Sequence, residues 1–201
     1  MKSHYLLGPL LWISSLQYFA VQVLVAATWT HPYSLTGNYI SDLGNTILSP
    51  LHSLMNASFV LLGVTMSIGA LLIMRQLQVR KLVLVGFAFL LLSGIGTVMV
   101  GLFPENVLRP VHTLGASLPF IYGNLALILI GVGERRLPGW LRTYGLIFGS
   151  LALVALIFYL LHNYLGIGLG SLERVVAYPQ TVWLILMGLH LAKKETFLTT
   201  Q

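Results

Sequence analysis

The sequence predicts an all-α polytopic membrane protein in which residues 1–201 form a single transmembrane domain, a bundle of six transmembrane helices. Of the 201 residues, 57% are hydrophobic and only 8% are charged, whereas soluble domains carry roughly 25% charged residues. The chain therefore has too few charges to cover a soluble surface, and the absence of cysteine excludes a disulfide-bonded module and thiolate chemistry. Six apolar stretches are long enough to cross roughly 30 Å of hydrocarbon.

The six expected spans follow one another with short polar breaks. They cover about residues 5–28, 50–74, 82–103, 110–133, 143–165 and 171–192. The first stretch is longer than the apolar region of a signal peptide, so it is interpreted as an uncleaved span. Within the later spans, Pro119 and Pro179 are expected to kink their helices, and the small residues from Gly94 to Gly101 indicate close helix packing.

The longest break, residues 29–49, has one acidic and no basic residue but several apolar side chains. A loop of this length is usually functional or disordered. Its apolar residues favour a folded cap that rests on the helix ends; the alternative is an interfacial belt of Tyr and Trp. We call residues 29–49 the cap loop.

The distribution of basic residues predicts the orientation. Nine lie before span one, after span six, or in the breaks after spans two and four: Lys2, Arg75, Arg80, Lys81, Arg135, Arg136, Arg142, Lys193 and Lys194. Only Arg109 and Arg174 lie on the other side. Because positive residues stay cytoplasmic, both termini are expected inside, and the net charge of +6 needs no nucleic-acid partner.

Charged residues of both signs and most of the histidines are expected on the outer side. Five charged residues are expected there, namely Asp42, Glu105, Arg109, Glu173 and Arg174, with four histidines, His31, His52, His112 and His162. This concentration predicts an outward-facing polar site.

A near-repeat suggests a metal site within this cluster. His52 follows Pro50 and His112 follows Pro110, 60 residues apart, and Glu173 has the comparable place in the third hairpin. Two His and one Glu form a known zinc constellation with an open position for water. The alternatives are that the helix dipole favours Glu173 and that the histidines are ordinary interfacial residues.

The same residues allow acid/base chemistry without a metal. His112 is the expected acid/base, Asp42 or Glu173 would orient or deprotonate a water, and Ser41 is a candidate nucleophile, although no GxSxG motif is present. Arg174 or Arg109 would hold an anionic headgroup. Further candidate ligand-binding residues are Glu105, Tyr178 (one turn from Arg174) and Asn56 (one turn from His52).

Three segments, in their order, resemble a bacterial and archaeal membrane family catalogued as domain of unknown function 998. They are Ile40-Ser-Asp-Leu-Gly44, Gly101-Leu-Phe-Pro-Glu-Asn-Val107 and Leu172-Glu-Arg-Val-Val-Ala-Tyr-Pro179. The resemblance covers about residues 7–192 and implies a six-helix bundle in a bacterial or archaeal cytoplasmic (inner) plasma membrane. It implies no activity, and it marks as family positions Ser41, Asp42, Pro104, Glu105, His112, Glu173 and Arg174. A looser likeness, to seven-helix membrane hydrolases of the alkaline-ceramidase and adiponectin-receptor group, lacks their seventh helix and its histidine pair.

The sequence leaves three functions open and does not decide whether the protein is an enzyme. The first is binding or processing of a lipid or amphiphile at the outer leaflet. The second is a small-solute transporter or channel, whose path would be lined by polar residues within the spans: Gln17, Gln22, Asn56, Asn124 and Thr181. The third is a structural or accessory subunit, with outer histidines as haem or pigment ligands or with Asp42–Arg174 or Glu173–Arg109 ion pairs that lock the helix ends.

Overall fold

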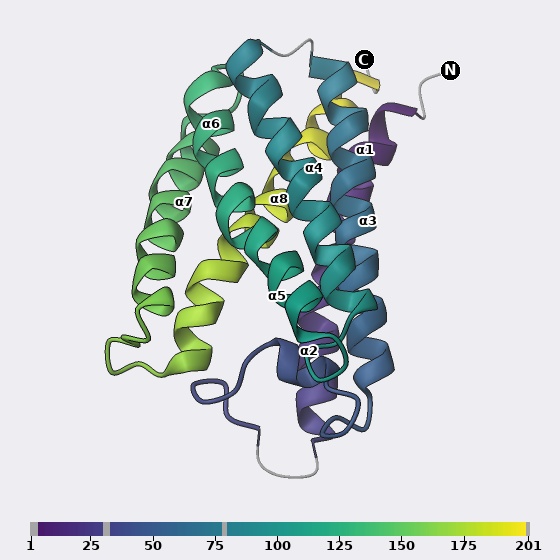
Figure 1. The fold of residues 1–201 in the computed structure, drawn as a ribbon. Helices are drawn as coiled ribbons and strands as arrows, with labels where there is room; N and C mark the ends of the chain where they lie inside the picture. The colour runs from purple at the N-terminus through teal and green to yellow at the C-terminus, as the bar shows by residue number, and fades with distance from the viewer. Residues whose placement is uncertain (1–3, 30–32, 78–79, 200–201) are drawn as a thin grey trace.

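The computed structural model describes residues 4–29, 33–77 and 80–199, with the side chains of residues 4, 5, 76, 77 and 194–199 left out. Among these residues all regular structure is helical. The elements are α1 (His4–Ile13), α2 (Leu16–Ala27), η1 (Ser41–Gly44), α3 (His52–Leu77), α4 (Lys81–Leu102), α5 (Arg109–Leu118), η2 (Pro119–Gly123), α6 (Asn124–Gly133), α7 (Gly139–Leu160) and α8 (Leu169–Thr199). Helix α1 begins and α8 ends at the same end of the bundle (Figure 1).

Six helical segments are long and apolar enough to cross a membrane, which confirms the predicted fold class. They are Leu6–Ala27, His52–Arg75, Lys81–Leu102, Arg109–Gly133, Gly139–Leu160 and Leu169–Lys193. The expected spans agree with these to within about five residues at each end, and the largest differences are at the ends of the fifth span. Residues 33–51 lie over the other end of the bundle from the α1 start (Figure 1), and we call this the cap end.

Two spans contain an interruption. Span one breaks between α1 and α2 at Ser14 and Ser15. In span four, η2 is one turn of π-helix that begins at Pro119, where a proline cannot donate the usual helical hydrogen bond. Asn124, the residue after this turn, joins it to α8, because its Nδ2 donates both to the Phe120 carbonyl (2.9 Å) and to the Val176 carbonyl of α8 (3.0 Å). The predicted disturbance at Pro119 is thus a π-turn tied to α8.

The predicted small-residue contact lies between α3 and α4. A Cβ atom added to Gly63 would collide with the Gly94 carbonyl oxygen, and one added to Gly94 would collide with the Ser67 hydroxyl. Glycine is therefore required for these two helix backbones to approach so closely.

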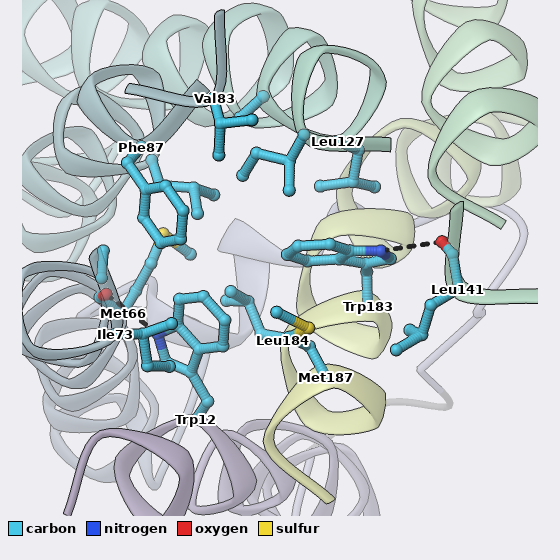
Figure 2. Packing of buried hydrophobic residues seen from close by; sticks show 14 of the residues in the cluster. Trp12, Met66, Ile73, Val83, Phe87, Leu127, Leu141, Trp183, Leu184 and Met187 are labelled. Carbon is cyan, nitrogen blue, oxygen red and sulfur yellow. Dashed lines mark hydrogen bonds between the residues drawn. The ribbon is translucent and has the colours of Figure 1, made fainter. Parts of the chain in front are cut away.

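The end of the bundle opposite the cap is filled by apolar side chains. Figure 2 shows Trp12 of α1, Phe87 of α4 and Trp183 of α8, each fully buried, at the centre of this group. The two indole N–H groups donate to the Met66 and Leu141 carbonyls at 3.1 and 3.2 Å, so the polar atom of each tryptophan is satisfied. We call this group, which also includes Leu127, Ile130, Leu184 and Met187, the tryptophan cluster.

Candidate functional site

The described part of the cap loop, residue 29 and residues 33–49, is folded, and its own polar side chains hold its turns. Asp42 Oδ2 accepts the Tyr39 backbone N–H at 2.8 Å and Asn38 Nδ2 at 3.2 Å. Ile40 and Leu43 are buried, at 3% and 1% exposure. Asn56 of α3 donates from Nδ2 to the Gly44 carbonyl at 2.9 Å. The loop is therefore a packed cover rather than a belt of interfacial aromatic residues.

Arg174 of α8 anchors the cap loop. Its Nη1 donates to the carbonyls of Leu35 (2.8 Å) and Asn38 (3.0 Å), and its Nη2 donates to the Tyr33 hydroxyl at 2.6 Å. A guanidinium has five N–H donors in a fixed fork, which allows one side chain to hold several loop groups at once. Arg174 therefore acts first as a structural anchor.

Glu173, the preceding residue, holds the next part of the same loop. Its Oε2 accepts the Ile40 backbone N–H at 2.6 Å, and the residue is only 6% exposed. This bond places Ser41 and the η1 turn against α8. A buried carboxyl group is costly without partners. The Ile40 N–H is one partner of Glu173, and the carboxyl group also lines a cavity.

Ser41 and Glu105 join the cap loop to the turn between α4 and α5. Ser41 Oγ donates to Glu105 Oε2 at 2.9 Å. The Glu105 carboxyl also lies close to Asp42, outside the spans: burial first, and then the hydrogen bond and charge of Glu105, raise the pKa of Asp42 to about 6. Two carboxyl groups of this cluster are therefore electrostatically linked.

His112 lies on the first turns of α5, which begins with Arg109 and Pro110. Its Nδ1 lies 2.9 Å from the Phe103 carbonyl. Because a carbonyl only accepts, Nδ1 carries the proton in that bond, and the neutral ring keeps the lone pair on Nε2. His112 is 7% exposed. In this geometry Nε2 is the ring nitrogen that can accept a proton.

These side chains converge on a cavity of about 190 Å³, here called the main cavity. Its polar end is made by Ser41, Glu105, Arg109, His112 and Glu173. Its other walls come from α5, η2 and α7, namely Ala116, Phe120, Ile121, Leu156 and Leu160. Tyr39 and Tyr159, whose ring centroids are 6.3 Å apart, line it where the cap loop meets α7. The lining thus combines a charged and polar group of residues, here called the polar end, with apolar side chains.

A smaller cavity of about 50 Å³ lies deeper in the bundle and shares Ser41, His112 and Glu173 with the main cavity. Its deeper wall includes Thr97, Gln180 and Thr181. This volume is enough for ordered water beside polar groups. The two cavities therefore meet at His112 and Glu173.

Several expected site residues lie elsewhere. His52 Nδ1 lies 2.9 Å from the Ser49 carbonyl at the start of α3, and Tyr178 donates to Gln22 Oε1 at 2.8 Å. Asn56, Asp42 and Arg174 hold the cap loop, and none of these five residues lines the main cavity. His162 is exposed at the end of α7, and His31 is outside the described residues.

The structure does not assemble the expected zinc triad. His112 and Glu173 share a cavity, but His52 does not reach it. Within the described ranges, no three His, Asp or Glu side chains are placed to hold a metal ion. The near-repeat of Pro and His does not give the two histidines the same helical position, because His52 is the first residue of α3 and His112 is the fourth residue of α5.

The expected ion pairs are also not formed. In the part of the chain that the structure describes, the one ion pair joins Arg136 to Glu134 at 2.6 Å, between α6 and α7. Neither Asp42–Arg174 nor Glu173–Arg109 is paired, because Arg174 turns to backbone carbonyls and Glu173 turns to a backbone amide. Mutual neutralisation therefore does not explain the cluster.

The polar residues within the spans form separate local pairs. Ser58 donates to Gln17 Oε1 at 2.7 Å, and Ser93 donates to the Gln180 amide oxygen at 2.7 Å. Farther from the cap end, the tryptophan cluster fills the core. These pairs make no continuous polar path across the bundle among the described residues.

Sequence reasoning missed four residues that line the main cavity: Tyr39, Thr113, Ser117 and Tyr159. A signal existed for Ser117 and Thr113, which lie one turn apart on the α5 face that also carries Arg109. No signal placed Tyr159, because its position depends on how α7 packs against α6 and α8.

Comparison with known proteins gives one match. The chain matches the family described as "Protein of unknown function (DUF998)" over residues 12–190. Neither the curated proteins nor the solved structures gave a match. The matched range covers nearly the whole helical bundle together with Ser41, Glu105, His112 and Glu173, as the resemblance of the three segments predicted. The chain therefore belongs to the DUF998 family.

Proposed function

We propose that this protein binds an amphiphile of the outer membrane leaflet, with its headgroup in the main cavity and its hydrocarbon part between α5 and α7. The observation that carries the proposal is that one cavity is lined both by charged and polar side chains and by apolar ones. Ligand pockets are typically apolar with a few polar groups that fix orientation. A cavity of about 190 Å³ holds a headgroup and the first carbons of a chain, and the remainder would lie in the bilayer.

The polar end favours a headgroup with both donor and acceptor groups. Glu105 and Glu173 are acceptors when ionised, and Arg109 at the first turn of α5 is a donor. A helix N-terminus also favours negative charge. The arrangement suits a zwitterionic headgroup or one that carries hydroxyl or amino groups.

Processing of the bound headgroup would depend on His112. With Nδ1 held by the Phe103 carbonyl, Nε2 can take a proton from a headgroup hydroxyl or from a water between it and Glu173, and later return it to a leaving group. General acid/base catalysis of this kind contributes typically 10²–10⁴-fold to a rate. Ser41, whose hydroxyl donates to Glu105, would position the headgroup.

The two other functions receive less support. A transporter needs a path through the core, and the tryptophan cluster fills that space. An accessory role based on ion pairs at the helix ends is not favoured, because these charges bond to the backbone instead.

The test is to purify the protein in lipid nanodiscs and identify copurified amphiphiles by native mass spectrometry. Ala116 lines both cavities, so Ala116→Phe should fill the space and remove the bound species. Ala88→Phe is the matched control because Ala88 is exposed on α4. An identical complement of bound amphiphiles in wild type and Ala116→Phe would refute the proposal.

A second arm separates binding from processing. His112→Ala should leave an amphiphile bound but change the lipid profile of cells that express it. The matched control is His162→Ala, because His162 is exposed in the turn after α7. A lipid profile that responds to neither variant, with binding intact, would restrict the function to binding.

A further inference from the structure

A second, larger cavity lies between α2, the cap loop and α8. Its volume is about 460 Å³, and its lining includes Gln22, Val23 and Ala26 of α2 and Arg174 and Tyr178 of α8. It shares no lining residue with the main cavity or the deeper one. We call it the α2 cavity, and it is independent of the site proposed above.

The α2 cavity is next to the buried positive charge of Arg174, which feels the charge of the adjacent Glu173 but forms no ion pair with an acidic group among the described residues. Arg174 is 9% exposed, and its hydrogen bonds among the described residues go to backbone carbonyls and to the Tyr33 hydroxyl. Burial raises the pKa of Tyr33 to about 12, so this hydroxyl stays neutral. A buried charge without a counter-ion is costly, and an anion in the cavity would remove that cost.

Two hydrogen-bond donors of the lining residues have no acceptor in the described structure. They are Arg174 Nε and Gln22 Nε2, both buried. Tyr178 donates to Gln22 Oε1 at 2.8 Å. The amide oxygen of Gln22 is therefore satisfied, and its amide nitrogen is the atom without a partner. Buried polar groups are nearly always hydrogen-bonded. Two vacant donors and no acidic lining residue define a place for an acceptor that carries negative charge.

The cavity lies near the cap-loop end of span one and opens beside exposed residues of α2. Span one ends at Ala27, so Gln22 lies roughly 8 Å from its end at 1.5 Å per residue. Val23, which also lines the cavity, is 72% exposed. An occupant would therefore enter from the surrounding lipid rather than through the cap loop.

We propose that the α2 cavity binds the anionic headgroup of a membrane amphiphile, whose phosphate or carboxylate oxygens accept the N–H groups of Arg174 and Gln22. The apolar α2 residues that line the cavity would contact the first part of its chain. A bound headgroup would also stabilise the cap loop, because the same Arg174 side chain would bind the headgroup and already bonds to the loop.

The test compares nanodiscs of phosphatidylcholine alone with nanodiscs that contain phosphatidylglycerol as the anionic probe, and it measures retained lipid by native mass spectrometry. Wild type should retain phosphatidylglycerol in preference to phosphatidylcholine. Gln22→Leu should weaken this retention about tenfold, the value of one hydrogen bond to a charged group. Ala26→Phe, which fills the cavity, should abolish it, and Ala88→Phe on the exposed face of α4 should not change it.

Three outcomes would overturn the proposal. The first is equal retention of the two lipids by wild type, and the second is a preference that neither Gln22→Leu nor Ala26→Phe alters. A third arm titrates inorganic phosphate into phosphatidylcholine nanodiscs; binding there without any preference for phosphatidylglycerol would assign the cavity to a free anion instead. Thermal unfolding of each variant identifies any that fails to fold, and Gln22→Leu, which is nearly isosteric, leaves every Arg174 contact in place.

Discussion

The two ends of the bundle differ in what fills the space between their helices. At the end opposite the cap, Trp12, Phe87 and Trp183 are fully buried and both indoles are hydrogen-bonded. At the cap end, the space holds cavities of about 190 and 460 Å³ and buried charged side chains that have no ion-pair partner. Packing at one end stabilises the fold, and the open, charged space at the other end is available for ligands.

The charged residues of α8 divide the cap end further. Glu173 and Arg174 are consecutive, and both bond to the cap loop, but Glu173 lines the main cavity and Arg174 lines the α2 cavity. Helix α8 thus supplies a negative residue to one cavity and a positive residue to the other, and the cap loop is bonded to both residues.

The largest expected effect is a loss of stability from a substitution in the tryptophan cluster. Trp183→Ala should lower the free energy of unfolding by about 3–5 kcal/mol, because within a membrane the loss is that of packing contacts and of the indole hydrogen bond. The measurement is thermal unfolding in detergent. The amphiphile bound per folded molecule should not change.

Trp140→Ala is the matched control for this variant, because Trp140 is 54% exposed on α7. Equal losses of stability in the two variants would mean that the tryptophan cluster does not carry the stability of the bundle.

A smaller effect is expected at the cap end. Arg174→Gln removes the donors to the Leu35 and Asn38 carbonyls and to the Tyr33 hydroxyl, and should destabilise the cap loop locally by about 1–3 kcal/mol. Hydrogen exchange of the backbone amides of residues 33–49 should speed up, while that of the tryptophan cluster should not. Tyr33→Phe should give part of this effect.

Arg135→Gln is the control, since Arg135 is exposed at the opposite end. Uniform acceleration of exchange along the whole chain in Arg174→Gln would show that the two ends unfold together, and the comparison would fail.

The sequence predicted the fold because composition and span length depend on the bilayer and not on particular contacts; the orientation that the basic residues indicate stays a prediction. It also predicted which residues gather at one end: Ser41, Glu105, His112 and Glu173 do line one cavity. It did not predict the directions of Arg174, Asp42 and His52, because these depend on the rotation of each helix and on the fold of the cap loop. The π-turn after Pro119, which Asn124 joins to α8, depends in the same way on tertiary packing.

The smallest expected effect concerns pH and tests the link between the cap loop and the main cavity. The pKa of Asp42 is raised from 3.8 to about 6, first by burial and then by Glu105. The folded state therefore binds the proton more tightly than the unfolded state, and this contribution to stability is fully present below about pH 3.8 and is lost as the pH rises through 6. Exchange of the cap-loop amides, corrected for its intrinsic pH dependence, should speed up between pH 5 and 7. Asp42→Asn keeps an acceptor for the Tyr39 amide and should remove this step, whereas Glu105→Gln should move it to lower pH. A step that persists unchanged in Asp42→Asn would assign the pH dependence to another group and separate the cap loop from the acidic end of the main cavity.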